Sequence, residues 1–560
     1  MPFIPFFLAG YVAALCVALP WLNPSSFGPS MMVFSALAAW WGAVGLCLCF
    51  GTLLATRQAR WQALLWGWAL AAGLSALMGL VQYFDQTTSF APWINYAGLG
   101  QAFGNLRQRN QFATLCSMGL TILWWWAQYA RVSAQTVSDP TANASAKGVM
   151  PVTSTVLSIS ADGPKAWAGA ALTLTLLAGA ALVCTAAAAT SSRTAFLQLL
   201  LLLGLAWCWR PSAPALGGMY RGLGLVGFML LAYVLAAWLL PLAAGVEGSV
   251  FERMRESPDG CESRVALYRN VLYLITQKPL TGWGWGELDY AHFMTLYTTP
   301  LAGVRFCAIL DNAHNLPLHW AVEWGLPLAL LACGGLLWLL RRMQPWREAV
   351  PQRQLAWAVL AMIGLHSLLE YPLWYGPFQI AALMCVWVLW AFPQQGPDAR
   401  TDGVLNGHTD MPRRASPAQA DGSREWTWRL AAGALALACA VATWNYRAMS
   451  QLYLSAEQRA PEYQEQTFSK VHGAWFFGGH VDFAELAITP LESWNAQHLM
   501  NLAEKTLHFS PEAKVVETIL NAALLLQRAD KIAIYAPRYA AAFPEDFTRW
   551  RQAHADLDLP

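Results

Sequence analysis

A succession of long apolar runs constrains the fold of this chain more than any other feature of its sequence. A hydrocarbon core about 30 Å thick requires roughly 20 apolar residues of helix to cross it. With 56% hydrophobic and 12% charged residues, the 560-residue chain is too apolar for an ordinary soluble protein. We therefore predict an all-α polytopic integral membrane protein with about eleven transmembrane helices in a lipid bilayer. The runs lie near residues 5–22, 31–55, 62–80, 111–130, 166–190, 194–209, 222–245, 317–340, 354–370, 377–393 and 429–447.

Basic residues occupy alternate connections between these runs, and such residues mark the cytoplasmic side of a membrane protein. This rule predicts a cytoplasmic N-terminus, a C-terminus outside, and a long outer loop at 246–316. Because the basic residues form short clusters and the net charge is only +2, nothing indicates a nucleic-acid partner. The clusters are Arg57/Arg60, Arg131/Lys147/Lys165, Arg210/Arg221, Arg341/Arg342/Arg347/Arg353 and Arg413/Arg414/Arg424.

The composition changes along the chain indicate two domains. Residues 1–448 form the predicted transmembrane domain, with cytoplasmic linkers at 132–164 and 394–425, where small and polar residues gather. In residues 449–560, charged residues alternate with Ala and Leu at helical spacing. We interpret this part as a small outer helical domain, comparable with tetratricopeptide hairpins although without a clean 34-residue repeat.

A polar segment that contains His314 leads into the apolar run at 317–340. Pro317 suits the first turn of a helix, so we predict that the helix begins at about Leu316 and crosses the membrane. His314 then lies just outside its outer end. An imidazole can take a proton from a hydroxyl near neutral pH, which makes His314 a candidate general base. The alternative is a structural histidine whose ring bonds a backbone carbonyl.

Several arginines lie on the predicted outer side, against the topology rule. A guanidinium matches phosphate oxygens with two parallel hydrogen bonds, so these residues indicate an anionic, phosphorylated ligand. The alternative is that each is salt-bridged or extends along the membrane surface. They are Arg107, Arg109, Arg193, Arg264 and Arg269.

Two further patterns are candidates for the same region. Glu323 follows His319 by four residues and Glu370 follows His366 by four, so each pair shares a helix face and could orient or move protons. Mutual neutralisation in the packed interior is the alternative. Cys261 and Cys307, the only cysteines of the long outer loop, either form a disulfide or remain two buried thiols.

The sequence lacks the motifs that other ligands require. We find no Walker loop, no Asp-x-Asp pair and no dinucleotide fingerprint. His314 and His319 have no third metal ligand at a fixed spacing. These observations argue against a soluble nucleotide substrate and against a metal site.

Several stretches resemble the O-antigen ligase/polymerase superfamily, and within it the bacterial protein O-oligosaccharyltransferases, or pilin glycosylation ligases. His314-Asn315 followed by Gly325 resembles the ligase motif, although Leu328 departs from the small or Thr/Val residue often found at its end. Ser192-Arg193-Thr194 and Ser263-Arg264 resemble the two outer-face arginines of the family. Residues 103–113 and 366–375 resemble signatures of the protein-ligase subgroup.

The resemblance implies a GT-C-like membrane enzyme that transfers a preassembled oligosaccharide from undecaprenyl pyrophosphate to a Ser or Thr of a periplasmic protein such as pilin. Arg264 and Arg193 would hold the pyrophosphate, while His314 takes the acceptor proton. It also implies inversion in a single displacement, no metal, no cofactor, and an inner-membrane location in a Gram-negative bacterium with a periplasmic active site. Further donor contacts would come from Arg107, Arg109 and Arg269, and orienting or acceptor-side contacts from Asn315, His319, Glu323, His366, Glu370 and Tyr371.

Two other function classes compete with this one. A ligase that delivers O-antigen to lipid A-core, or a polymerase that extends the glycan on its lipid, would differ only in the acceptor. A transporter of lipid-linked glycans would also be polytopic with charged residues in its membrane domain, but we expect those near the midplane and related by repeated halves. The charged candidates here lie on the outer side instead.

Overall fold

The computed structural model describes residues 3–25, 28–136, 165–210, 216–246, 260–394, 422–471 and 473–554, and these ranges are helical without any strand. Residues 137–164 and 395–421 of the predicted linkers lie outside the described residues. The protein is an all-α polytopic membrane protein. Its apolar helices are α1 (Phe3–Leu22), α2 (Met31–Thr52), α3 (Arg57–Tyr83), α4 (Arg109–Thr136), α5 (Lys165–Ala189), α6 (Arg193–Cys208), α7 (Leu216–Ala244), α12 (Leu326–Met343), α13 (Pro351–Ser367), α14 (Gly376–Ala391) and α16 (Gly422–Ser450).

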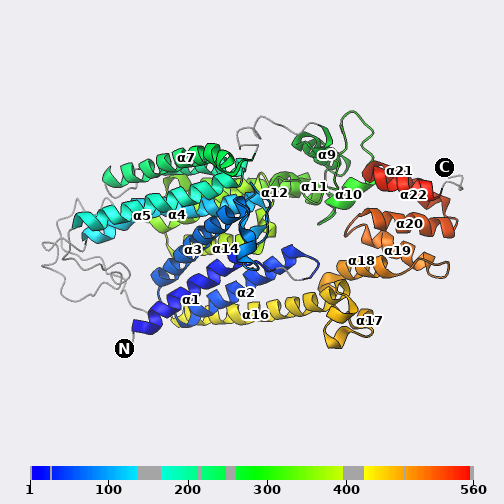
Figure 1. The fold of residues 1–560 in the computed structure, drawn as a ribbon, viewed down its shortest axis with the longest axis horizontal. Coiled ribbons are helices and arrows are strands. Elements are labelled where there is room, and N and C mark those ends of the chain that lie inside the picture. The colour runs from blue at the N-terminus through cyan, green and yellow to red at the C-terminus, as the bar shows by residue number, and fades with distance from the viewer. Residues whose placement is uncertain are drawn as a thin grey trace.

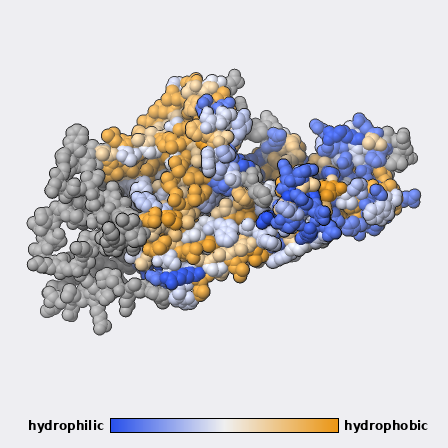
Figure 2. Space-filling view, turned by 60° about the horizontal axis from the view of Figure 1, so that its bottom comes forward, coloured by the Kyte–Doolittle hydropathy of each residue, from blue (hydrophilic) through white to orange (hydrophobic). Residues whose placement is uncertain are grey.

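Each predicted apolar run falls on one of these helices except the run at 317–340, which is divided between α12 and a shorter helix before it, and the helices differ in length and hydropathy. Within the described residues, six are long and apolar enough to span it, namely α2, α3, α5, α7, α12 and α16. α1, α6 and α14 are shorter apolar helices. Figure 2 shows the hydrophobic surface of this bundle, which gives way to a hydrophilic surface over the C-terminal helices.

The centre of the bundle is α4, which packs against α3, α5, α6, α7 and α13. Phe112, Leu115 and Trp124 are fully buried in this packing. A helix that neighbouring helices surround has little contact with lipid, so it can also carry polar side chains. This explains why Gln111 and Thr114 lie buried on a helix that contributes to the membrane core.

The predicted single helix over 317–340 is wrong, because the chain breaks at Gly325. α11 (Leu316–Trp324) begins where Pro317 indicated, and α12 starts anew at Leu326. Gly325 has φ 83° and ψ 163°, and a Cβ there would lie 2.4 Å from the carbonyl oxygen of Leu280. The 279–284 segment approaches so closely because the Leu326 N–H donates to the Pro279 carbonyl at 2.8 Å. Only glycine tolerates both the conformation and the contact.

The predicted outer loop and the helices after α16 form a second helical layer beyond the end of the bundle (Figure 1). The loop contains α9 (Arg264–Gln277) and α10 (Leu288–Met294), and a disulfide joins Cys261 to Cys307 with Cα atoms 5.2 Å apart. After α16 the longer helices pack in succession, each against the next. They are α18 (Gly478–Ile488), α19 (Ala496–Thr506), α20 (Ala513–Leu525), α21 (Ala529–Ala542) and α22 (Pro544–Ala553).

The outer loop and the C-terminal helices share a core. Phe293 of α10 is fully buried among apolar side chains of the C-terminal helices. Arg538 Nε donates to the Met294 carbonyl at 2.8 Å, and His508 Nδ1 lies 2.7 Å from a carboxylate oxygen of Glu287. The C-terminal helices are therefore held against the same loop that supplies α11 and His314.

Candidate active site

The carboxylate of Glu370 is the point where segments that are distant in the chain meet. Glu370 lies in the turn beyond α13, and its side chain is only 7% exposed. Arg264 Nη2 donates to Oε1 at 2.6 Å, and Asn110 Nδ2 donates to the same oxygen at 3.0 Å. His314 Nδ1 lies 2.6 Å from Oε2. The beginnings of α4 and α9 and the segment before α11 thus converge on one carboxylate.

His314 is fixed in a backbone conformation that few residues other than glycine adopt. Its φ is +49°, in the left-handed region. Its N–H donates to Asn312 Oδ1 at 2.7 Å. The next residue, Asn315, caps α11 by accepting from the Leu318 N–H at 3.1 Å, and its Nδ2 donates to the Leu368 carbonyl at 3.0 Å. These bonds hold the backbone at His314 in place, and an unfavourable conformation kept in this way is typical of functional sites.

The contact with Glu370 determines how the His314 ring can react. Because a carboxylate only accepts hydrogen bonds, we assign the proton of the neutral ring to Nδ1. Nε2 is then the unprotonated nitrogen. With the His314 side chain 27% exposed, the ring is open to a substrate while its partner is buried. This arrangement can accept a proton from a hydroxyl and stabilise the resulting imidazolium.

The surroundings of Glu370 keep it ionised. Burial raises the pKa of this carboxyl, but the hydrogen bond and charge of His314 and the charge of Arg264 outweigh it, so the pKa lies below its ordinary value. Arg264 is 48% exposed, and it uses Nη1 for the Leu369 carbonyl at 2.9 Å as well as Nη2 for Glu370. A guanidinium has five N–H donors, so further donors of Arg264 can serve an anion.

We call Glu370 and the three side chains that contact it, Asn110, Arg264 and His314, the cluster. Asn110, whose residue type and spacing predicted no role, connects it to the start of α6. Its Oδ1 accepts from Ser192 Oγ at 2.6 Å, while Ser192 Oγ accepts from the Thr194 N–H at 3.1 Å and so caps α6. Arg193 is the first residue of α6 and is exposed. Arg193 is therefore the next residue in the chain after Ser192, whose hydroxyl bonds Asn110. The position of Asn110 inside the 103–113 signature was the signal that could have identified it.

The expected pairing of His366 with Glu370 is wrong. α13 ends at Ser367, so Glu370 lies past the helix and its side chain turns to His314. His366 Nδ1 instead lies 2.9 Å from Thr114 Oγ1, fully buried in the bundle. Tyr371 does reach the site, because its ring meets the ring of His314 edge to face at 5.4 Å.

His319 and Glu323 contact each other as expected, but they lie in the helix that ends at the Gly325 break and not in the cluster around Glu370. His319 Nε2 lies 3.4 Å from Glu323 Oε1, and both side chains are buried. The same Glu323 oxygen accepts from the Gly286 N–H at 2.9 Å, which ties the 282–287 segment to α11. The His319 ring also lies 5.6 Å from that of Trp374. These contacts hold α11 in place beside the cluster.

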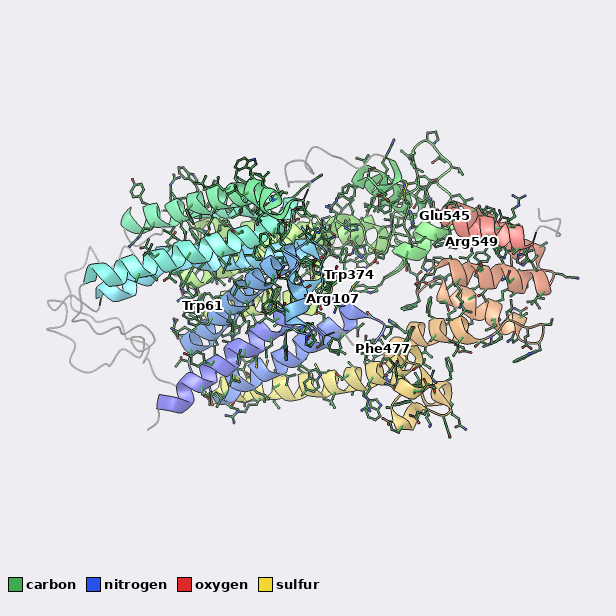
Figure 3. All side chains as sticks on the ribbon, viewed as in Figure 1. Trp61, Arg107, Trp374, Phe477, Glu545 and Arg549 are labelled. Carbon is green, nitrogen blue, oxygen red and sulfur yellow. A yellow bond between two sulfur atoms is a disulfide. The ribbon has the colours of Figure 1, made fainter. Side chains whose placement is uncertain are left out.

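The remaining arginines have different surroundings. Arg107, which has φ +59°, donates through Nη2 to the Pro24 carbonyl and to Asn95 Oδ1, both at 3.2 Å. Arg109 opens α4 and is half-buried, and Arg269 is exposed on α9. Figure 3 labels Arg107 and Trp374 at the end of the bundle that is nearest the outer loop.

Three protein families match separate stretches of the chain. O-antigen ligase matches residues 178–333, and protein glycosylation ligase matches residues 102–127. The C-terminal part of virulence factor membrane-bound polymerase matches residues 354–558. No curated protein and no solved structure gives a significant match.

The three matched stretches meet at the cluster described above. The 102–127 match contains Asn110, the 178–333 match contains Arg264 and His314, and the 354–558 match contains Glu370. Glu370 and the three side chains that contact its carboxylate therefore come from all three matched stretches together. The chain belongs to the superfamily of O-antigen ligases and protein glycosylation ligases.

Proposed function

We propose that this protein transfers a preassembled oligosaccharide from undecaprenyl pyrophosphate to a Ser or Thr hydroxyl of a periplasmic protein such as pilin. The observation that carries the proposal is the contact of His314 Nδ1 with Glu370 Oε2 beside the exposed guanidinium of Arg264. A positioned base and an anion-binding group are what such a transfer requires. Membership of the superfamily supplies the class of donor, a glycan linked to a lipid.

In the proposed reaction, His314 Nε2 takes the proton of the acceptor hydroxyl as its oxygen attacks the anomeric carbon. The bond from that carbon to the pyrophosphate oxygen breaks, and undecaprenyl pyrophosphate leaves with the electron pair. Arg264 and Arg193 stabilise the charge on this leaving group, and Glu370 stabilises the imidazolium. One displacement inverts the anomeric carbon. The step as written uses only groups of this chain and does not call on a metal ion.

The same cluster would also serve an O-antigen ligase that uses lipid A-core or a polymerase that extends the glycan, and the family matches include an O-antigen ligase and a membrane-bound polymerase. Two observations favour a protein acceptor. The protein glycosylation ligase match includes Asn110, which holds Glu370. The C-terminal helices also form a hydrophilic surface that is joined to the outer loop by the contact of His508 with Glu287, and a protein acceptor would dock at this junction.

The test uses the full-length chain in proteoliposomes with a lipid-linked oligosaccharide and either a pilin-type protein or lipid A-core. We expect mass spectrometry to find the glycan on Ser or Thr of the protein. His314→Ala should lower this transfer by about 10²–10⁴-fold, the usual effect of losing a general base. His498→Ala is the matched control, because His498 also contacts a glutamate, at 3.2 Å from Glu485, but lies in the C-terminal helices.

The outcomes separate the alternatives. Glycan on lipid A-core alone would assign the O-antigen ligase activity, and longer glycans on the polyprenyl lipid would assign the polymerase. Transfer by His314→Ala at the wild-type rate would remove His314 from the mechanism.

A further inference from the structure

α12 and α13 follow each other in the chain but do not pack together along their lengths. Only residues 344–350 connect them, and helices joined by so short a connection are normally packed neighbours. In α12, Ala329 is the only buried residue. Leu331 and Leu337 are 72% and 67% exposed, and side chains added at Gly334 or Gly335 would meet no atom within 4 Å.

α13 also has a side that is not fully buried. α13 is buried against α4, α6 and α14 except along one strip, which continues into the turn after the helix. A side chain added at Gly364, in the middle of this strip, would also meet no atom within 4 Å. We call it the α13 strip, and it consists of Leu360, Ala361, Gly364, Leu365 and Leu368, of which Gly364 and Leu368 are exposed and the others half-buried.

Both ends of α12 are nevertheless held in place. At the inner end, Gln394 Nε2 donates to the Met343 carbonyl at 3.2 Å, and Trp209 Nε1 donates to the Pro345 carbonyl at 2.8 Å. At the outer end, the Leu326 N–H donates to the Pro279 carbonyl. The stretch between, from residue 330 to residue 339, is about 15 Å of helix, or half of a hydrocarbon core.

The outer end of the α13 strip lies at the catalytic cluster. The carbonyl of Leu368, the last strip residue, accepts from Asn315, which is next to His314. The carbonyl of Leu369 accepts from Arg264 at 2.9 Å. An apolar surface that begins inside the membrane therefore ends beside the guanidinium to which we assign the pyrophosphate.

We propose that α12 and the α13 strip bind the polyprenyl chain of the donor, an inference that rests on the proposed function. An anionic head group at Arg264 places the attached chain where the strip begins. Ala361 and Gly364 allow close approach, which matters because packing rather than the hydrophobic effect drives association inside lipid. Binding the chain here aligns the anomeric carbon with His314.

The test compares two donors in the proteoliposome assay, one with the full undecaprenyl chain and one with the same glycan pyrophosphate on a farnesyl-length chain. Gly364→Leu fills the strip without removing any contact. We expect it to lower the ratio of kcat/KM for the long-chain donor to that for the short-chain donor by about tenfold, because the added side chain removes the packing of the polyprenyl chain on the strip. Gly433→Leu is the matched control, because Gly433 is also an exposed glycine of a membrane helix with no atom near an added side chain.

An unchanged ratio of the two kcat/KM values in Gly364→Leu would overturn the proposal. If both values fall by the same factor, the ratio is also unchanged and the substitution has only a structural effect. A second measurement identifies the occupant. A donor with a photoreactive group on its polyprenyl chain should label peptides of α12 and α13, and excess unlabelled donor should suppress the labelling. A photoreactive phospholipid provides the comparison. If it labels the same peptides equally well, and if unlabelled donor does not suppress that labelling, the surface binds bulk lipid and the proposal is wrong. If the wild-type chain transfers glycan from neither donor, the proposed function itself has failed.

Discussion

Replacing Glu370 by Gln tests whether this carboxylate controls the reactivity of His314. The substitution keeps the size of the side chain but puts an NH2 group in place of one oxygen. If the amide oxygen still faces Arg264 and Asn110, the NH2 group faces His314 Nδ1. Nδ1 must then accept a hydrogen bond, so the ring proton moves to Nε2. Nε2 can then no longer accept a proton from the acceptor hydroxyl.

The magnitude follows from the geometry. With Nδ1 2.6 Å from Oε2, the centres of the two charges lie about 4 Å apart, and unit charges at that distance attract by about 4 kcal/mol at an effective dielectric constant of about 20. Losing this stabilisation of the imidazolium corresponds to about 10³-fold in rate. Allowing for the partial exposure of His314 and for the change of tautomer, we expect transfer to fall by about 10²–10⁴-fold.

Stability should change much less than activity. Arg264 is half exposed, so water solvates its charge when the carboxylate is gone, and such a pair contributes about 1 kcal/mol or less. The melting temperature should therefore fall by no more than a few degrees. The assay is glycan transfer in proteoliposomes beside thermal unfolding in detergent, with Glu485→Gln as the control because Glu485 contacts His498 away from the cluster. Transfer within a factor of three of wild type would refute the assignment of Glu370.

Three other predictions concern the outer loop. Arg264→Lys should reduce kcat/KM at least tenfold, because an ammonium cannot reproduce the fork that spans two acceptors, and equal activity would make Arg264 only an electrostatic neighbour. In denatured, unreduced protein, Cys261 and Cys307 should resist a thiol reagent that labels the other cysteines, and labelling of both before reduction would exclude the disulfide. Burial raises the pKa of Asp289 to about 7, so the folded protein keeps a proton that the unfolded chain loses, and stability should fall as pH rises from about 4 to 7. Asp289→Asn should flatten this dependence in thermal unfolding, and an unchanged slope would contradict the cause.

The sequence alone determined which segments form the apolar helices, apart from the break at Gly325, and where the candidate base lies. Apolar length is enough for the helices, because lipid offers backbone groups no partners and the chain must bond them within each segment. Pro317 correctly located the start of α11 at Leu316, which left His314 outside the helix. The apolar length of a helix and the position of its first turn depend on residues that are neighbours in the chain, so the sequence is sufficient to predict them.

Only the tertiary structure decided which residues surround that base. The spacing of His366 and Glu370 indicated a helical pair, but α13 ends between them, and Glu370 contacts His314 from 56 residues away in the chain. The role of Asn110 and the break at Gly325 also depend on segments that are distant in sequence, one on Glu370 and the other on the chain at Pro279. Periodicity records which face of a helix is apolar, whereas a contact between separate segments depends on how the helices pack. The residues of the site were therefore visible in the sequence, and their partners were set by the packing.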